Sequence, residues 1–127
     1  MPGLTTQSSD SPALIGVTIL LVEDEPAIRQ LIATSLECAG YRVLQAKNGA
    51  EALKVFDNTV DLLVTDLRMP YVGGEALVGE LRARRRTLKV LAFSAYPPTA
   101  LKDDVPFLGK PFSRAQLLKA VHAALGS

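Results

Sequence analysis

The stretch DLLVTD (residues 61–66) predicts a short buried strand that ends on the carboxylate of Asp66. Three other segments share this design, in which an apolar run is followed at once by a polar residue. They are Ile19–Val22 before Glu23 and Asp24, Val90–Phe93 before Ser94, and Val105–Leu108 before Gly109 and Lys110. Because the carboxyl ends of parallel strands lie at one edge of a sheet, these polar residues predict a single site at that edge.

Strand and helix signals alternate along the chain from Val17 onwards. The expected strands cover residues 17–22, 41–46, 60–65, 88–93 and 105–108, and helical patterns follow the first three and the last of them. The segment 95–104 contains Pro97 and Pro98 and leaves room for at most one or two helical turns. These signals predict an α/β fold with a parallel sheet and helices on both faces, in which the fourth helix is short or missing.

Single residues mark where the expected helices begin and end. Pro26 suits the first turn of the first helix, and Gly40 suits its end. Asn48 and Ser113 suit the caps of the second and the last helix. We expect one apolar face of the first helix to point into the core, with Cys38 packed near its end. This face comprises Ile28, Leu31, Ile32, Leu36 and Ala39.

Length, charge and composition exclude several classes of protein. A chain of 127 residues fits one domain, which we assign to residues 17–127, with residues 1–16 as a flexible tail. The net charge of +1 argues against a broad grip on nucleic acid, and we interpret the arginines between residues 82 and 86 as the solvated end of a helix. No apolar run approaches the roughly 18 residues needed to cross a bilayer. The single cysteine allows no internal disulfide and no secretory signal is visible, which fits a cytoplasmic protein.

The acidic residues at the predicted sheet edge raise an electrostatic problem that suggests their chemistry. Glu23, Asp24 and Asp66 would repel one another, and Mg²⁺ is the natural remedy because it binds one or two carboxylates and completes its shell with water and phosphate oxygens. A carboxylate can also act as a nucleophile and form an aspartyl phosphate. Lys110 would supply a second countercharge, and Ser94 a hydroxyl donor. These residues suit the acceptance of a phosphoryl group, whereas no segment is suited to position a nucleotide.

Four motifs in this order resemble those of the response-regulator receiver domain, the phosphoacceptor family of two-component signalling. They are ILLVEDE (residues 19–25), DLRMP (66–70), Ser94-Ala95 and Lys110-Pro111-Phe112, and the resemblance covers about residues 17–125. It implies a flavodoxin-like five-stranded sheet with strand order 2-1-3-4-5. It also implies a cis peptide bond between Lys110 and Pro111, which proline tolerates better than other residues do.

The same resemblance implies an acceptor and a set of metal ligands. Asp66 would be the phosphoacceptor and also belong to the metal site. Asp24 would be a direct ligand of Mg²⁺, whereas Glu23 would act on the ion through water. The backbone carbonyl of Arg68 would complete the protein's share of the ligands, and Lys110 would hold the phosphoryl group.

The resemblance further implies which residues respond to phosphorylation and how long the phosphoryl group stays on Asp66. Ser94 would be the switch hydroxyl, and Phe107 the aromatic side chain that turns inward as the hydroxyl moves toward the phosphate. A fixed core aromatic is the alternative for Phe107. Arg68 and Tyr96, two residues after Asp66 and Ser94, are large enough to hinder water, and we expect slow loss of the phosphoryl group.

The partners implied by the resemblance are those of a bacterial phosphorelay in the cytoplasm. A histidine kinase or a histidine phosphotransfer protein would donate the phosphoryl group, and another protein would be the downstream target, with no role for nucleic acid or a membrane. The domain would not be an enzyme, beyond assisting its own phosphorylation and dephosphorylation. Because the segment 95–104 is short, we expect a monomer. With no output domain after Gly126 and Ser127, the chain would be a stand-alone regulator or part of a larger protein.

Three other functions compete with this interpretation. A receiver-like scaffold that is never phosphorylated would bind a partner through the same fold. A phosphatase with an aspartate nucleophile would need a second acid two residues after it, where Arg68 stands. A flavin-binding protein of similar topology would need a loop rich in Ser, Thr or Gly after the first strand, where this chain has Glu23 and Asp24.

Overall fold

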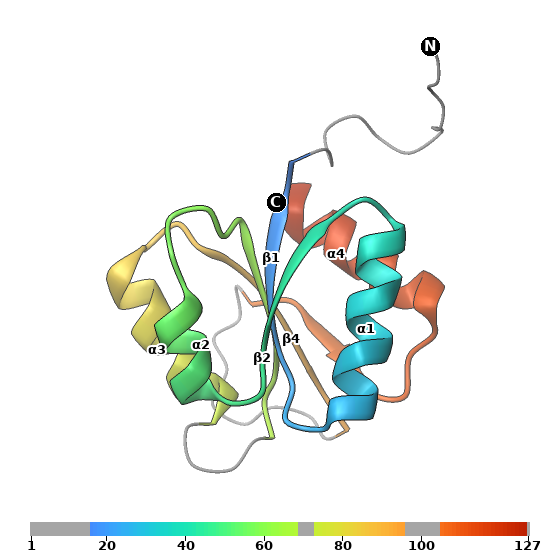
Figure 1. Ribbon diagram of the computed structural model, residues 1–127, viewed down its shortest axis with the longest axis horizontal. Helices are drawn as coiled ribbons and strands as arrows, with labels where there is room; N and C mark the ends of the chain where they lie inside the picture. The colour runs from blue at the N-terminus through green and yellow to red at the C-terminus, as the bar shows by residue number, and fades with distance from the viewer. Residues whose placement is uncertain (1–15, 69–72, 96–104, 127) are drawn as a thin grey trace.

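Five parallel strands form one sheet in the computed structural model, which describes residues 16–68, 73–95 and 105–126. The order across the sheet is β2-β1-β3-β4-β5, as the resemblance implied. The strands are β1 (Thr18–Val22), β2 (Arg42–Ala46), β3 (Leu62–Asp66), β4 (Lys89–Ser94) and β5 (Phe107–Gly109). In the view of Figure 1, their carboxyl ends lie at the bottom, where β1 leads into α1.

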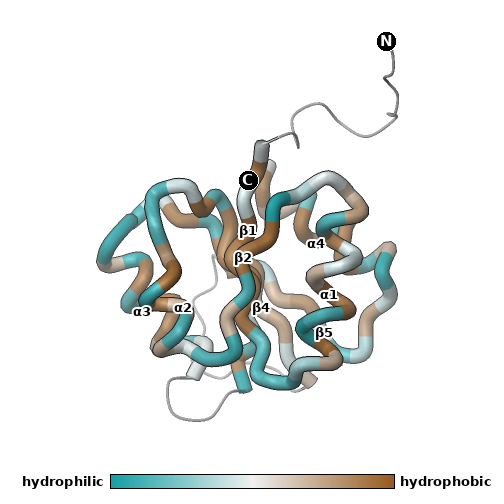
Figure 2. The backbone as a smooth tube through the Cα atoms, viewed as in Figure 1, coloured by the Kyte–Doolittle hydropathy of each residue, from teal (hydrophilic) through white to brown (hydrophobic). Residues whose placement is uncertain are grey.

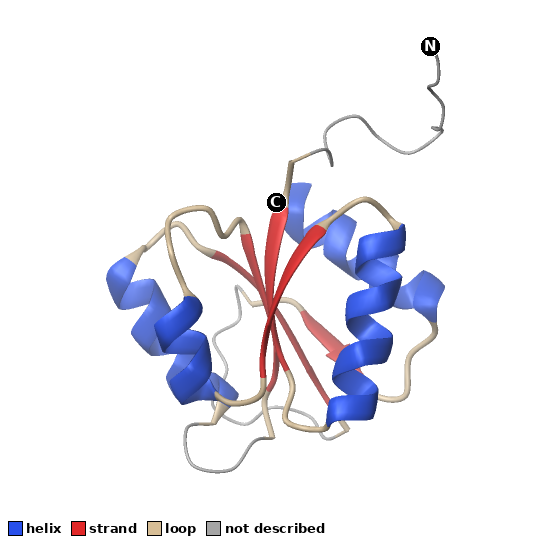
Figure 3. Ribbon diagram, in the orientation of Figure 1, coloured by secondary structure: helices blue, strands red, loops and turns tan. Residues whose placement is uncertain are grey.

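The described residues form four helices, arranged in two pairs. They are α1 (Pro26–Cys38), α2 (Gly49–Val55), α3 (Gly74–Arg84) and α4 (Arg114–Gly126). Helices α1 and α4 cover one face of the sheet, and α2 and α3 cover the other (Figures 1 and 3). The predicted two-sided α/β fold is therefore confirmed. The helix expected to be short or missing falls on residues 96–104, and the expected tail falls mainly on residues 1–15; both segments lie outside the described residues.

Two apolar cores, one on each face, hold the helices to the sheet. Alternate residues of a strand point to opposite faces, so Leu20 and Leu63 join the core under α2 and α3. Their neighbours Ile19 and Leu62 join the core under α1 and α4. This division explains why the strands are apolar without alternation. Figure 2 shows a related pattern, with hydrophobic residues frequent along the central strands and both hydrophobic and hydrophilic residues along the helices.

The predicted helix signals are confirmed at each position. Pro26 begins α1, and Gly40 follows it with a φ of 102°, a left-handed conformation that glycine adopts without strain. The Asn48 side chain accepts a hydrogen bond from the Glu51 N–H at 2.7 Å and caps α2. Before α4, the Ser113 hydroxyl accepts from the Gln116 N–H at 3.0 Å, while the Gln116 side chain accepts from the Ser113 N–H at 2.8 Å.

Three predictions about individual elements are wrong. Leu31 is 68% exposed, because α1 turns Ile32 and Leu36 into the core and Leu31 lies about 100° away around the helix. Cys38 is exposed for the same reason, rather than packed. The fifth strand is Phe107–Gly109 instead of residues 105–108, since pairing with β4 starts at Phe107.

No helix among the described residues is long and apolar enough to cross a membrane.

Gly74 marks the closest approach of α3 to the end of β3. A Cβ atom at this position would lie 2.4 Å from the carbonyl oxygen of Asp66 and 2.7 Å from the Cα of Leu67. Both are backbone atoms, which cannot rotate away as a side chain can. The first residue of α3 therefore has to be glycine for the strand end that carries Asp66 to keep its position.

We expect Gly74→Ala to lower the free energy of unfolding by about 1–3 kcal/mol, because the added methyl group forces backbone shifts. Urea denaturation measures the effect. Gly79→Ala is the matched control, since a Cβ at this exposed position of the same helix meets nothing within 4 Å. It should stabilise the domain by about 0.5–1 kcal/mol through helix propensity. A Gly74→Ala variant as stable as the original chain would contradict the close approach.

Candidate functional site

One lysine joins two buried carboxylates at the carboxyl edge of the sheet. The Lys110 ammonium lies 2.9 Å from Oδ2 of Asp66 and 3.0 Å from Oε1 of Glu23. Asp66 is the last residue of β3, Glu23 directly follows β1, and Lys110 directly follows β5. The two acids are only 4% and 1% exposed. The predicted meeting of these three residues at one edge is therefore confirmed.

Backbone amides hold the second oxygen of each carboxylate. The Arg68 N–H donates to Oδ1 of Asp66 at 2.8 Å, and the Glu25 N–H donates to Oε2 of Glu23 at 3.0 Å. In both cases the donor is the residue two positions further along the chain. Each acid is thus fixed from one side by its own loop and from the other by Lys110, which leaves both carboxylates oriented before any ligand arrives.

The backbone also places Ser94 and Lys110 relative to Asp66. Asp66 is paired with Phe93 in the sheet, so Ser94 lies one residue further toward the same edge. The Lys110 N–H donates to the Ser94 carbonyl at 2.8 Å, and this bond continues the pairing of β4 with β5 beyond the last strand residue. Ser94 is 1% exposed. The hydroxyl predicted for the switch is therefore a buried group at the rim of the site.

Burial sets the protonation of this cluster. It raises the pKa of Glu23 to about 7, although the hydrogen bonds from Glu25 and Lys110 act in the opposite direction. Burial would lower the pKa of Lys110, but hydrogen bonds to Asp66 and Glu23 outweigh it and raise that pKa above its ordinary value. Lys110 is thus a cation at neutral pH, whereas Glu23 exchanges its proton in the neutral range because its pKa is raised to about 7.

A third acid completes a group that can hold a hard cation. Asp24 is exposed, and its carboxylate, together with those of Glu23 and Asp66, offers oxygens that all lie within 4.8 Å of one another. Oxygen donors alone, with part of the shell open to water, fit Mg²⁺ better than a softer metal. The donor set therefore agrees with the predicted Mg²⁺ site. The carbonyl of Arg68 as a fourth ligand stays a prediction.

Two features of the site are not indicated by the strand-end pattern of the sequence. The guanidinium of Arg29, in the first turns of α1, donates to the backbone carbonyl of Glu23 at 2.8 Å. The ammonium of Lys110 lies 5.1 Å from the centre of the Phe93 ring, which itself meets the Phe112 ring edge-on at 5.8 Å. The Arg29 contact thus holds the backbone of Glu23, and the Phe93 ring supports the ammonium of Lys110.

The other predicted site residues have different outcomes. The Lys110-Pro111 peptide bond is cis, as the resemblance implied. Phe107 is 37% exposed at the start of β5, so the alternative of a fixed core aromatic is wrong. Its role as a switch stays a prediction. Arg68 is exposed, whereas Tyr96 lies outside the described residues.

Comparison with known proteins agrees with this fold. Residues 19–122 match the model of the response regulator receiver domain. The chain belongs to the response regulator receiver domain family, and it is a phosphoacceptor domain of two-component signalling.

Individual members of this family show how similar the chain is to proteins already described. It is 38% identical over 117 residues to the sensor kinase CckA of Brucella abortus, a match that covers 85% of the chain and 12% of that kinase. The solved receiver domain of the hybrid histidine kinase CckA is 37% identical with a TM-score of 0.76, over 85% of this chain and 98% of that one. TrrA of Thermotoga maritima, solved in complex with Mg²⁺-BeF, is 33% identical with a TM-score of 0.77, over 86% and 99%. The chain thus spans a small part of the full-length CckA and nearly all of the solved receiver domains.

The acidic group leads to a prediction about Mg²⁺. The ion should stabilise the folded domain by about 2.7 kcal/mol when its concentration is one hundred times the dissociation constant. Asp24→Asn should remove most of this gain, because it takes a charged oxygen ligand from an exposed position. Thermal unfolding with increasing MgCl₂ measures the effect. Glu25→Gln is the matched control and should keep the full response. Equal stabilisation of the Asp24→Asn variant and the original chain would count against Asp24 as a ligand.

Proposed function

We propose that Asp66 accepts a phosphoryl group from a phosphohistidine of a histidine kinase or a histidine phosphotransfer protein. The observation that carries this proposal is the arrangement of Asp66 between the Lys110 ammonium and a backbone N–H, beside two further acids. Phosphoryl transfer requires little of a protein except positioning and charge neutralisation, and this arrangement offers both.

The chemistry follows from these contacts. A carboxylate oxygen of Asp66 forms a bond to phosphorus while the phosphorus–nitrogen bond of the donor histidine breaks, and the electron pair stays on the imidazole. The Lys110 ammonium, held by Glu23 as well, then faces a phosphoryl oxygen in place of Oδ2. Glu23, Asp24 and Asp66, with the Arg68 carbonyl, would hold Mg²⁺, which when bound neutralises charge on the phosphoryl oxygens. The same residues assist the reverse loss of the group to water, which Arg68 and Tyr96 slow.

The phosphorylated domain acts by changing its binding to a downstream protein. Ser94 donates its hydroxyl to the phosphoryl group, and Phe107 changes position in response. The exposed side chain of Phe107 supports this role, since an aromatic ring that turns inward has to start from an outward position. A ligand that binds one of two arrangements more tightly shifts the population toward it. We place the domain in the bacterial cytoplasm as a monomer that acts without contact to nucleic acid or a membrane.

An apolar groove next to Lys110 is proposed as the seat of the phosphodonor. Its volume is about 400 Å³, and it lies between α1 and the loop after β5. Leu31, Pro111 and Phe112 line it together with Lys110, which also contacts Asp66. Because the groove and the acceptor site share Lys110, a partner that covers Leu31 with an apolar helix would bring its phosphohistidine close to Asp66.

The acceptor is tested by phosphotransfer with Asp66→Asn. We expect this variant to gain no phosphoryl mass from a histidine kinase or from a small phosphodonor with Mg²⁺, because an amide is a poor nucleophile. Intact-protein mass spectrometry measures the gain. Asp61→Asn, directly before the first residue of the same strand, is the control and should be phosphorylated normally. If neither the original chain nor the control gained mass from any donor, a scaffold that is never phosphorylated would be the better interpretation.

The donor seat is tested by Leu31→Ser. Loss of a central apolar contact should slow transfer from a cognate protein donor about tenfold, while phosphorylation by a small phosphodonor stays the same. Val55→Ser is the matched control, since Val55 is an exposed apolar residue on the opposite face of the sheet. Rates of transfer from the phosphorylated donor protein measure the effect. Equal slowing by both variants would remove the groove from the donor interface.

A further inference from the structure

The loop between β1 and α1 carries two of the three acids that fit a hard cation. Only three residues, Glu23, Asp24 and Glu25, separate the strand from the helix. Asp24 is exposed, so packing against the core does not fix its side chain as burial fixes those of Glu23 and Asp66. The direction of the Asp24 carboxylate therefore depends on how the backbone of this loop is held.

The start of α1 holds only the end of the loop. Glu25 is the N-cap residue, and its side chain forms no capping hydrogen bond within the described part of the chain. Pro26 follows it and has no N–H group to donate. The Arg29 N–H donates to the Glu25 carbonyl at 2.9 Å, as expected in a first helical turn. These contacts leave the peptide between Glu23 and Asp24 to be held by another group.

The guanidinium of Arg29 holds that peptide. Side chains on a helix lean toward its N-terminus, so Arg29 reaches back over the first turn of α1. There it donates to the Glu23 carbonyl at 2.8 Å, while the Glu23 N–H donates to the Ala46 carbonyl at 3.1 Å. Because the Glu23 carbonyl lies in one rigid plane with the Asp24 N–H, the arginine fixes the peptide that leads into Asp24.

The partner of Arg29 leaves the acids available to a cation. Its guanidinium binds a neutral carbonyl oxygen, whereas the ion pairs of Glu23 and Asp66 in the described residues are made by Lys110. Oxygens of the three acids still lie within 4.8 Å of one another. The positive charge of Arg29 opposes a cation nearby, but water screens this repulsion because the arginine is only half-buried.

We propose that Arg29 is a positioning residue of the cation site, which holds the Glu23–Asp24 peptide so that the acids stay together. The proposal rests on the Mg²⁺ site of the proposed function. Removing a group that holds a metal ligand from outside typically weakens metal binding by about 10–100-fold. Positioning and charge act in opposite directions here. Loss of positioning weakens Mg²⁺ binding, whereas loss of the positive charge alone would strengthen it.

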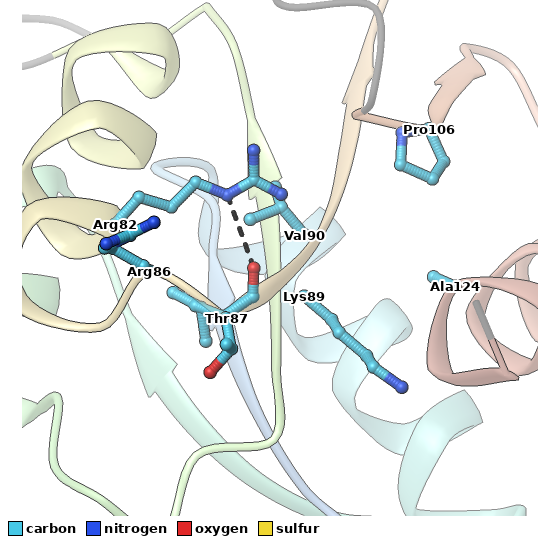
Figure 4. Close-up of a pocket in the computed structure, with 8 residues that line it drawn as sticks. Arg82, Arg86, Thr87, Lys89, Val90, Pro106 and Ala124 are labelled. Carbon is cyan, nitrogen blue, oxygen red and sulfur yellow. Dashed lines mark hydrogen bonds between the residues drawn. The ribbon is translucent and has the colours of Figure 1, made fainter.

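A matched arginine lies at the opposite, amino edge of the sheet. Arg82 is half-buried, as Arg29 is, and its Nε donates to the Leu88 carbonyl directly before β4 at 3.3 Å. Figure 4 shows this bond as a dashed line between the Arg82 side chain and the backbone. Arg82 therefore also joins a helix to a backbone carbonyl beside a strand, but at the other end of the sheet from the acids.

The test is a titration of the unphosphorylated full chain with MgCl₂, followed by amide chemical shifts. Arg29→Met, a long side chain without donor or charge, should bind Mg²⁺ about tenfold more weakly. Arg29→Lys keeps the charge and one donor group and should recover part of the affinity. Arg82→Met is the matched control and should stay within about twofold of the original chain. Urea denaturation without Mg²⁺ checks that each variant is folded, and Arg29→Gln replaces Arg29→Met if that variant is not.

The outcomes distinguish the role of Arg29 from the proposed function. If the original chain bound no Mg²⁺, the cation site would fail and the role of Arg29 with it. If the original chain bound Mg²⁺ and Arg29→Met bound it as tightly or more tightly, the role of Arg29 alone would be overturned. Weakening of the same size in Arg82→Met, or no recovery in Arg29→Lys, would also overturn it.

Discussion

The site depends on one ammonium group placed between two buried carboxylates. Without Lys110, the buried Asp66 carboxylate would lose its ion pair, and breaking a buried ion pair by removing one partner costs about 3–5 kcal/mol. The lysine can reach both because its own backbone N–H is bound to the Ser94 carbonyl, which fixes the loop after β5. The charge balance of the site is therefore set by the pairing of β4 with β5.

Topology explains why the acids meet. In the order β2-β1-β3-β4-β5, the strands that end before Glu23 and at Asp66 are neighbours, so their end residues must lie side by side. This part was predictable from the sequence, because strand ends are marked locally by an apolar run and a polar residue. The helix caps were predictable for the same reason. Gly74 was not, since its need for a bare Cα arises from the backbone of β3 passing within contact distance.

The incorrect predictions share one physical cause, which is that side-chain surroundings depend on elements far apart in the chain. The apolar stripe of α1 includes Leu31 by sequence, yet only the position of the sheet and α4 decides which side of the stripe is covered. The arginines between residues 82 and 86 are similar in sequence. In the structure Arg84 donates to the Leu53 carbonyl and Arg85 to the Asn58 carbonyl, both beside α2, whereas Nε of Arg82 donates to the Leu88 carbonyl before β4.

The residues around Asp66 favour a site that keeps a phosphoryl group over one that hydrolyses it. A phosphatase with an aspartate nucleophile would have its second acid two residues later, where Arg68 contributes a backbone N–H to the carboxylate and extends an exposed cation. The nearby acids Glu23 and Asp24 belong to the group that fits a cation, and Glu23 is already bound to Lys110 and the Glu25 N–H. An acyl phosphate at Asp66 would thus face the Lys110 ammonium, while the position of the second acid that such a phosphatase needs is taken by an arginine, which cannot act as that acid.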